Sequence, residues 1–476
     1  MNWAAEADVI CIGGGISGLV CGARAAELGL RVIVLERGAD ESYACNSRYS
    51  AGVFHASYLD VTLAQPELEA AMRKATAGQG DDALIVAIAT HAARALEWLR
   101  QQGGKFIRGP QRSWVMAPPR GMSTGLDWKG RGPDALLRQL TQRITERQGR
   151  IMLGTQAGNL VMDGTKLKGV KAKCGDAELQ IAAPAVLIAD GGFQANFDLF
   201  RAHIGPHPDR VFQRNAGTAF GDGLKMALEA GAAYTRLDRF YGHLLSRDVF
   251  QNAELWPFPQ LDAPAAAAIL VDPDGRRLFD EGLGGIFLSN EIAKMDDPLS
   301  TTVVCDAKIW DVAGREHQVP PNPLLEKHGG TLHRADTIEQ LAEKAGLFAE
   351  GLAESVRTYN AWVDSAGQNP LSPSRTAAKT KPQPIRHPPF MAIPVCSGIT
   401  NTMGGIKIDA HARAIDMAGA VIPGLYCAGA ALGGLEGGDN VGYVGGLIKS
   451  VFGLRAAEHM AESFIPEKAA GRAAAS

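Results

Sequence analysis

The sequence lacks the features that mark several large classes of protein. No two of its seven cysteines are spaced Cys-x-x-Cys, so neither a zinc site, nor any other metal site, nor a disulfide framework is predicted. No apolar run reaches the length of a membrane span, and no secretory signal precedes the first strand pattern, so we expect a cytoplasmic protein. The net charge of −3 is too small to indicate nucleic acid as a partner.

Glycine, in contrast, is abundant and unevenly placed. The chain has 56 glycines among 476 residues, and they gather at a few junctions. Such clusters mark places where the backbone turns tightly or approaches a ligand. The length predicts two or three domains, and 46% hydrophobic with 21% charged residues is typical of a globular protein.

The N-terminal segment "ADVICIGGGISGLVCGARAAELGLRVIVLER" predicts a βαβ unit. Residues 9–12 form an apolar strand, residues 16–28 have helical periodicity, and residues 32–35 form a second strand. A βαβ unit predicts a parallel sheet and an α/β fold.

The turn between this strand and helix matches the dinucleotide fingerprint. Gly13, Gly15 and Gly18 have the G-x-G-x-x-G spacing, and Glu36 ends the second strand. The bare pattern is weak, but here it follows a strand, opens a helix and is followed by an acid that can accept ribose hydroxyls. Its backbone N–H groups can meet a pyrophosphate at a helix N-terminus. A second glycine-rich strand end, "IPGLYCAGAALGG", returns near the C-terminus, which favours the long FAD over NAD.

The rest of the chain divides by composition. Residues 66–104 read as helices and residues 151–192 as strands, and a final helix is predicted at about 445–462. Residues 237–384 differ, running from a Trp-Pro cluster to a proline-rich boundary. In "SGITNTMGGIKID" a strand is predicted after the two glycines. The tail, 465–476, is predicted to be disordered.

Seven stretches together resemble the fumarate reductase/succinate dehydrogenase flavoprotein family along nearly the whole chain. They are the N-terminal segment, "NSRYSAG", "VLIADGGFQAN", "GTAFGDGLKMALEAGA", "GRRLFDEG", "TMGGIKID" and "IPGLYCAGAALGG". "GRRLFDEG" and "GGFQAN" are similar to the tricarballylate dehydrogenase and 3-ketosteroid dehydrogenase branches. The resemblance implies a Rossmann-like FAD-binding domain of glutathione-reductase type, formed by 1–236 and 385–464, with an inserted α+β capping domain at 237–384.

The resemblance also implies which residues contact FAD. The pyrophosphate would lie at the fingerprint turn, the ribose at the acid, and the last helix would point its N-terminus at the flavin. The implied cofactor-binding residues are Gly13, Gly15, Ile16, Ser17, Gly18, Glu36, Arg37, Asn46, Ser47, Ser50, Ala51, Gly52, Gln156, Ala157, Asp190, Gly191, Asp222, Gly429, Gly445, Gly446 and Leu447. FAD is expected to be non-covalent, because Arg48 and Tyr49 stand where a flavinylated His would be.

Three departures separate the chain from fumarate-reducing members. Asn401 replaces a substrate-binding His, Gly285 stands in the place of the proton-donating Arg, and Val441 replaces a further Arg. Classical fumarate reduction is therefore not expected. Asn401 can bond a neutral carbonyl or hydroxyl, or it can simply cap local backbone.

Four residues are the candidates for catalysis: Tyr443, His243, Asn401 and Tyr241. Tyr443 lies in a glycine loop and could be a base or an oxyanion donor, and His243 matches a segment that holds a substrate histidine in the family. The alternatives are that His243 is a structural or surface residue and that Tyr443 packs against the flavin or the cap. Arg48 and Arg131 are candidate anion ligands, and the "ELWPFPQLD" aromatics are candidates for an apolar pocket.

The leading hypothesis is an FAD-dependent dehydrogenase or reductase acting on a C–C/C=C bond next to a carbonyl or carboxyl of a small molecule. A base takes the acidic proton, an oxyanion donor steadies the enolate, and flavin N5 exchanges the hydride. An oxidase and a catalytically impaired flavin-binding protein are the alternatives. The chain carries no haem or iron–sulfur motif, so the unknown electron acceptor or donor is a separate protein, a quinone or oxygen.

Overall fold

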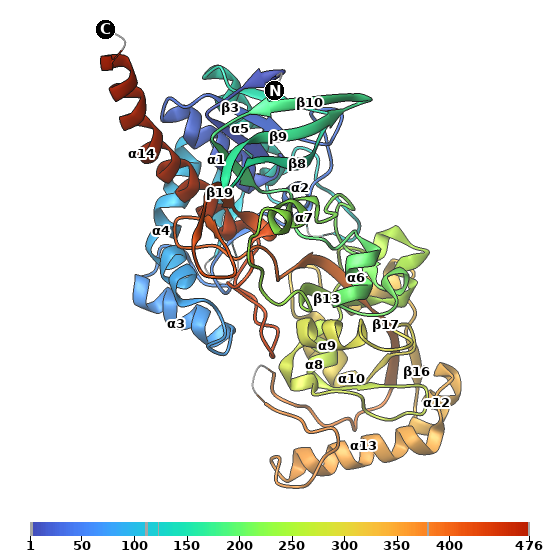
Figure 1. Cartoon of the computed structure of the whole chain (residues 1–476). Helices are drawn as coiled ribbons and strands as arrows, with labels where there is room; N and C mark the ends of the chain where they lie inside the picture. Colours follow the sequence, from blue (N-terminus) through green and yellow to red (C-terminus); the bar gives the residue numbers. More distant parts are fainter. Residues whose placement is uncertain (1–2, 110–112, 122, 378–379, 475–476) are drawn as a thin grey trace.

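The computed structural model describes residues 3–109, 113–121, 123–377 and 380–474. Figure 1 shows two lobes, one carrying both termini and the other built mainly from the middle of the chain. Each lobe has its own hydrophobic core. The first core draws on residues from both halves of the chain, and the second is formed by buried residues between Leu244 and Cys396. The predicted domain boundaries at 237 and 385 stay predictions.

A six-stranded sheet with the order β18-β19-β11-β2-β3-β7 forms the centre of the first lobe. All neighbouring strands in it are parallel except β18, which pairs antiparallel with β19. Its strands are β2 (Val9–Ile12), β3 (Val32–Leu35), β7 (Arg150–Met152), β11 (Ala185–Ile188), β18 (Arg413–Ile415) and β19 (Val421–Cys427). The predicted bounds of the first two strands are confirmed. Residues of β2, β3 and β11 are all buried, as expected for parallel strands covered on both faces.

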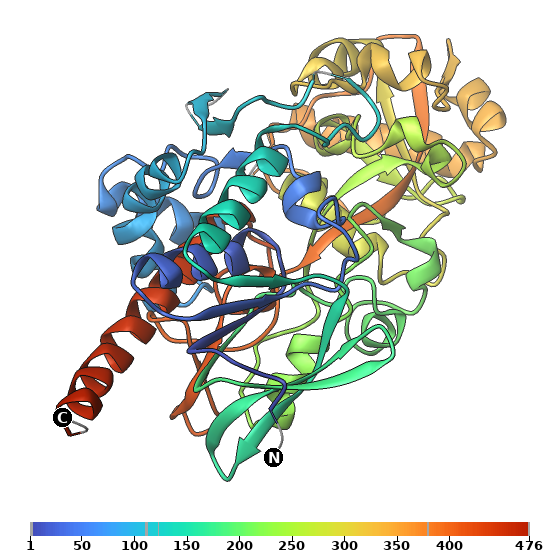
Figure 2. The same cartoon turned by 90° about the horizontal axis from the view of Figure 1, so that it is seen from above.

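Helices cover this sheet, and Figure 2 shows α14 projecting away from it. Those packed on the sheet are α1 (Ile16–Glu27), α5 (Gly132–Glu146) and α14 (Ser450–Ala474). The lobe also contains α3 (Gln65–Ala75) and α4 (Asp82–Gln101), with the short α2 (Asn46–Tyr49), α6 (Phe197–His203) and α7 (Asp222–Glu229). Asp81 caps α4 by accepting from the N–H groups of Ala83 and Leu84. Among the described helices, none is long and apolar enough to cross a membrane.

The last helix differs from its predicted span. A 3-10 turn at Leu447–Lys449 precedes it, so regular α-helix begins at Ser450 rather than near 445. The helix also continues into the segment that was predicted to be disordered. The backbone thus tightens next to the glycine loop before the α-helical hydrogen bonds start.

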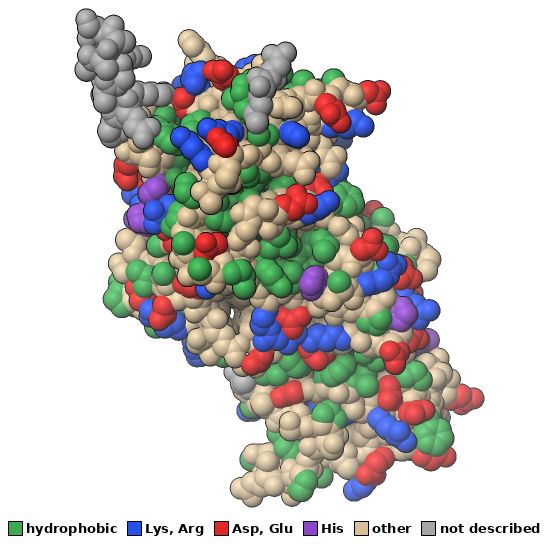
Figure 3. All heavy atoms as spheres, in the orientation of Figure 1, with side chains coloured by type: hydrophobic (Ala, Val, Ile, Leu, Met, Phe, Trp, Pro, Cys, Tyr) green, Lys and Arg blue, Asp and Glu red, His purple; other side chains and the backbone are tan. Residues whose placement is uncertain are grey.

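Two smaller sheets complete the first lobe. An antiparallel meander of β8 (Thr155–Asp163), β9 (Lys166–Cys174) and β10 (Ala177–Ala182) pairs with β1 (Ala5–Glu6). The other sheet joins β4 (Val53–Phe54), β5 (Phe106–Arg108) and β6 (Trp114–Met116). Figure 3 shows acidic and basic side chains interspersed over the face in view, in keeping with the small net charge.

The long strand β17 (Phe390–Thr402) organises the second lobe and runs back toward the first (Figure 1). It pairs with β12 (Phe212–Gln213), β13 (Phe240–Ser246), β15 (Thr302–Asp306) and β16 (His333–Ala335), and β14 (Ile269–Val271) pairs with β15. The helices around it are α8 (Asp262–Ala267), α9 (Gly285–Ile292), α10 (Ala307–Val312), α11 (Pro321–Lys327), α12 (Ile338–Ala345) and α13 (Ala349–Asp364).

The sequence prediction for "SGITNTMGGIKID" was wrong about which half forms the strand. Residues 397–402 belong to β17, whereas Ile406 and Ile408 form only isolated bridges. The two glycines explain the break. A Cβ on Gly404 would lie 1.8 Å from the carbonyl oxygen of Arg236, and one on Gly405 would lie 2.1 Å from that of Ala431. The backbone is therefore pressed between two other segments where the strand ends.

Candidate functional site

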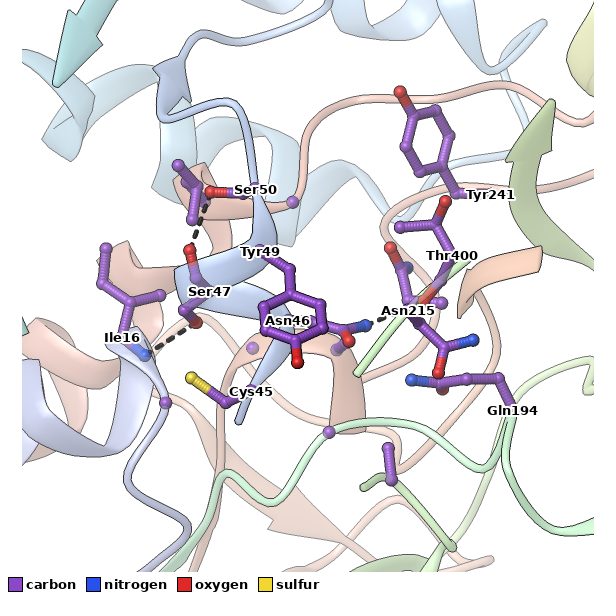
Figure 4. Close-up of a pocket in the computed structure, with 18 of the residues that line it drawn as sticks. Ile16, Cys45, Asn46, Ser47, Tyr49, Ser50, Gln194, Asn215, Tyr241 and Thr400 are labelled. Carbon is purple, nitrogen blue, oxygen red and sulfur yellow. Dashed lines mark hydrogen bonds between the residues drawn. The ribbon is translucent and has the colours of Figure 1, made fainter. Parts of the chain in front are cut away.

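A cavity of about 1030 Å³ lies between the glycine turn of the first lobe and the aromatic residues of the second. Figure 4 shows part of its wall, with Ile16, Ser47 and Ser50 on one side and Asn215, Tyr241 and Thr400 on the other. Predicted site residues that line it are Gly13, Gly15, Ile16, Ser17, Glu36, Arg37, Asn46, Ser47, Ser50, Ala51, Gln156, Ala157, Asp190, Gly191, Asp222, Tyr241, His243, Asn401, Gly429, Tyr443, Gly446 and Leu447.

Gly18, Gly52 and Gly445 do not line this cavity. Gly18 shapes the turn instead, because a Cβ on it would lie 2.0 Å from the carbonyl oxygen of Gly13. Gly13 itself has a φ of +102°, which a side chain would strain. The turn between β2 and α1 can therefore adopt this conformation only with glycine at both positions.

The acid at the end of β3 holds the glycine turn together. Glu36 accepts from the Gly14 N–H at 2.8 Å and from the Gly38 N–H at 2.7 Å. The Tyr43 hydroxyl donates to the Gly14 carbonyl at 2.6 Å. The carboxylate is 7% exposed, so it both fixes the turn and faces the cavity.

Helix α2 lies beside the glycine turn in the cavity wall. Ser47 Oγ accepts from the Ile16 N–H at 3.0 Å, which ties this segment to the start of α1. Asn46 bridges the two lobes, donating to the Thr400 carbonyl at 2.8 Å and accepting from the Ala216 N–H at 2.9 Å. The amide of Asn46 thus holds the middle of the cavity wall in place.

Charged groups gather at the far end, near the meander. Gln156 donates to Asp222 at 2.9 Å, and Arg37 Nη1 lies 3.7 Å from the same carboxylate. Asp190 accepts from the Gly223 N–H at 2.7 Å, and burial together with the charge of Asp222 raises the pKa of Asp190 to about 7. Its Oδ1 atom and Oε1 of Gln194 are buried without a hydrogen-bond partner among the described residues.

At the other end, two tyrosines from distant parts of the chain face each other. The rings of Tyr241 and Tyr443 stack with centroids 3.8 Å apart. Tyr241 lies on β13, and Tyr443 lies in the loop before the 3-10 turn. The Tyr443 hydroxyl accepts from the Gly446 N–H at 2.8 Å, so its own hydrogen is available to another acceptor. Burial raises the pKa of both phenols.

His243 lies beside Tyr241 on the same face of β13, since residues two apart in a strand point the same way. Its Nε2 atom is 2.8 Å from the Tyr241 hydroxyl, and its Nδ1 atom is 2.5 Å from Oδ2 of Asp262. Burial lowers the pKa of His243, and the charge of Asp262 opposes that effect. Both ring nitrogens are therefore engaged by the protein itself.

Asn401 is the cross-strand partner of Tyr241 in the β13–β17 pair. It is buried, lines the cavity and donates to the carbonyl of Thr402 at 3.0 Å. This bond agrees with the capping interpretation for its NH₂ group. The side chain nonetheless faces the same space as the tyrosines.

Sequence reasoning missed two arginines of the cavity wall, Arg214 and Arg120. Arg214 donates to Thr400 Oγ1 at 2.8 Å and to the Pro257 carbonyl at 3.1 Å. Both guanidinium groups lie near the Phe258 ring, at 5.6 Å for Arg214 and 5.1 Å for Arg120. Within the described part of the chain, neither has a carboxylate partner within ion-pair distance. Burial and the charge of Arg214 lower the pKa of Arg120 to about 10.

The two arginines that the sequence suggested as anion ligands form ion pairs outside the cavity. Arg48 is 1% exposed and pairs with Asp134 at 3.3 Å, and Arg131 pairs with Asp127. Neither lines the cavity. The suggested aromatic wall is present, because Trp256 and Phe258 both line it.

The fold and the cavity define a two-lobed α/β protein with a dinucleotide-type glycine turn, and comparison with known proteins identifies the family. Residues 8–442 match the family model described as FAD binding domain. The chain therefore belongs to this family of flavoproteins.

Individual relatives agree with this assignment. The chain is 30% identical over 372 residues to the NADH:acrylate oxidoreductase of Vibrio harveyi, covering 77% of this chain but only 35% of that protein. It is 26% identical over 480 residues to a fumarate reductase (cytochrome) of Shewanella frigidimarina, covering 96% and 77% of the two chains. The resemblance to fumarate reductase flavoproteins inferred from the motifs is confirmed.

A solved structure extends the likeness to the whole fold. The 3-ketosteroid delta1-dehydrogenase of Sterolibacterium denitrificans superimposes with a TM-score of 0.74 at 20% identity, covering 97% of this chain and all of that one. At this identity the likeness concerns the fold alone.

Proposed function

We propose that the protein is an FAD-dependent dehydrogenase or reductase that adds or removes two hydrogens across a C–C/C=C bond next to a carbonyl or carboxyl group. The stacked Tyr241–Tyr443 pair beside Arg214 is the observation that carries this proposal, because it puts proton donors and a cation at one end of the cavity. The names of the relatives, which act on acrylate and fumarate, support the same chemistry.

The residues present fit FAD. The cavity brings the glycine turn together with the Asn46 segment and the Asp190 end. Two buried oxygens of its lining residues, on Asp190 and Gln194, have no partner among the described residues and can accept hydrogen bonds from a ligand. We infer that the pyrophosphate lies against Gly15 and Ser47, the ribose near Glu36, and the flavin near Gly446. When bound, FAD supplies the two-electron hydride chemistry.

The chain's own groups handle the proton and the developing charge. Tyr443, which accepts from the Gly446 N–H, can donate its hydrogen to the carbonyl or carboxyl oxygen of the substrate and steady an enolate. Tyr241 is the candidate for the acid–base group that takes the proton from the substrate carbon in dehydrogenation and returns it in reduction. Arg214 places positive charge beside both phenols.

The two arginines indicate that the substrate has a carboxylate. Arg120 and Arg214 bracket Phe258, and among the described residues the carboxylates of Asp127 and Asp262 act on them only from beyond ion-pair distance. Burial and, after it, the charge of Arg214 lower the pKa of Arg120, and an anionic ligand in this wall would relieve the repulsion between the two cations. The protein would bind such a group with different residues from those of classical fumarate reduction.

Three finer features belong to the same proposal. FAD would be held without a covalent bond, because Arg48 is packed against Asp134 and Tyr49 carries no imidazole. Acid precipitation should then release all of the flavin into the supernatant.

The FAD-binding lobe would be of glutathione-reductase type, supported by the parallel sheet and the β8–β10 meander. The segment 237–384 would be the inserted cap, supported by the separate second core.

The decisive experiment is to reduce the FAD-loaded protein without oxygen and to mix it with acrylate, fumarate, 2-cyclohexen-1-one or air while following the visible flavin band. Rapid reoxidation by acrylate and slow reoxidation by air are expected. Rapid recovery in air with formation of peroxide would favour the oxidase. Recovery with none of these oxidants would favour a flavin-binding protein without activity, and absence of a flavin band after adding FAD would overturn the cofactor.

A further inference from the structure

The first residue of α9, Gly285, lies directly against Asp262. A Cβ at position 285 would be 2.1 Å from Cγ of Asp262 and 2.4 Å from its Oδ1 atom. Any larger side chain at this position would therefore displace the Asp262 carboxylate. The family resemblance implies a proton-donating arginine at position 285 in fumarate-reducing members. An arginine there would collide with the Asp262 carboxylate in its observed position.

Asp262 is held firmly by the second lobe. As the first residue of α8 it accepts from the Leu244 N–H through Oδ1 at 2.8 Å, which leaves Oδ2 directed at His243 Nδ1. A carboxylate is an acceptor only, so Nδ1 of His243 must carry the hydrogen in this contact. Nε2 then presents its lone pair to the Tyr241 hydroxyl, 2.8 Å away.

We propose that Asp262 is the positioning residue of a Tyr241–His243–Asp262 proton relay that replaces the missing arginine. This inference rests on the proposed function. In dehydrogenation the substrate C–H bond breaks as its proton bonds to the Tyr241 oxygen, the bonding electron pair stays on the substrate as an enolate, and the Tyr241 proton moves to His243 Nε2. In reduction the same protons move in reverse. Asp262 remains ionised throughout and balances the imidazolium.

Several other groups face this relay and share its electrostatics. Arg214 opposes protonation of His243, and His317 and His243 repel each other when charged. Burial raises the pKa of Tyr241, and the neighbouring Tyr58 hydroxyl opposes part of that rise. The charges that act on the relay are therefore those of the anion Asp262 and the cation Arg214, and Glu436 adds a second negative charge near Tyr241.

The first test is the tautomer of His243, measured by ¹⁵N NMR on holoprotein labelled at histidine and assigned by comparison with His243→Gln. We expect a proton on Nδ1 and a free Nε2 in the wild type. In Asp262→Asn we expect the proton to move to Nε2, because the amide can donate to Nδ1. A wild-type His243 with its proton on Nε2, or an unchanged tautomer in Asp262→Asn, would overturn the relay whether or not any substrate is turned over.

The second test is the rate of flavin reoxidation by acrylate and by 2-cyclohexen-1-one as a function of pH. Asp262→Asn should lower the rate with the active compound by about 100-fold or more and shift the acid limb of the profile, with retention of FAD. Gly285→Ala, which leaves the relay residues intact, should reproduce this effect. Asp306→Asn is the matched control, because Asp306 is a buried carboxylate of the same lobe that caps α10 instead. An Asp262→Asn profile like that of Asp306→Asn would refute the relay while leaving the proposed function intact.

Discussion

The phenol rings of Tyr241 and Tyr443 stack 3.8 Å apart with an angle of only 9° between their planes, although the two residues are 202 positions apart in the chain. One ring belongs to β13 of the second lobe and the other to the glycine loop before α14. Because the two hydroxyls reach the same space from different lobes, each can contact a different atom of one substrate. Substituting one tyrosine should therefore have a different effect on the reaction from substituting the other.

Tyr443→Phe should slow turnover without loss of FAD. The substitution removes the hydroxyl that accepts from Gly446 and that we expect to donate to the substrate oxygen. Loss of one oxyanion donor lowers kcat by about 100- to 1,000-fold. Stopped-flow reoxidation by acrylate measures the effect, and Tyr426→Phe, whose hydroxyl bonds His459 outside the cavity, is the matched control. Equal rates for Tyr443→Phe and the wild type would exclude Tyr443 from the chemistry.

Arg214→Gln should selectively weaken binding of anionic compounds. A hydrogen bond to a charged group contributes about 1.5–3 kcal/mol, so Kd for acrylate should rise by about 10- to 100-fold, whereas Kd for 2-cyclohexen-1-one should hardly change. Perturbation of the flavin spectrum on titration measures both. Arg210→Gln, which removes only an exposed ion pair with Asp297, serves as control. An equal effect on both compounds would assign Arg214 a structural role.

Gly15→Ala should weaken FAD binding without harming the fold. Gly15 has an extended conformation, and a Cβ there would meet only Ser47 Oγ, at an ordinary 3.4 Å. A methyl group would nevertheless occupy the space in which we expect the pyrophosphate. Fluorescence titration of the apoprotein with FAD should give at least about a tenfold increase in Kd. Gly158→Ala is the control, because Gly158 lies on the meander and a Cβ there would have its nearest contact at 3.8 Å, so this variant should bind FAD normally. Equal affinity of the two variants for FAD would show that the pyrophosphate does not lie against Gly15.

His55 should make the protein less stable as the pH falls below neutral. Burial lowers the pKa of His55 to about 4, while the unfolded chain has the usual value of about 6.5. Above pH 6.5 both states are neutral and the stabilisation is complete. Between pH 6.5 and 4 only the unfolded state binds the proton, so the free energy of unfolding falls by up to about 1.4 kcal/mol per pH unit.

Urea unfolding of the holoprotein between pH 8 and 4.5 tests this expectation. His55→Asn is the informative variant, because its amide oxygen can still accept from the Tyr58 N–H as Nδ1 of His55 does. The stability of the wild type should fall more steeply with acidification than that of the variant. If the free energy of unfolding falls with pH equally steeply in the wild type and in His55→Asn, then His55 keeps an ordinary pKa in the folded protein.

Local pattern was enough to define the first lobe's βαβ unit. Four consecutive apolar residues in each of the first two strands, the helical periodicity after Gly15 and the glycine spacing all act within a few residues of one another. Such short-range preferences are written in the sequence itself. The remaining FAD-contacting residues could be predicted from the family motifs, because each motif is also a short contiguous stretch.

Only the tertiary structure decided which charged residues face the cavity. Arg48 looked available in the sequence, but its partner Asp134 lies on another helix and buries it, whereas Arg214 and Arg120 reach the cavity wall. The Asp262 carboxylate can lie next to His243 only because Gly285 has no side chain, since a Cβ at position 285 would occupy the same space. Periodicity and motif spacing report the neighbours of a residue along the chain, whereas ion pairs, burial and excluded volume depend on segments that meet only after folding.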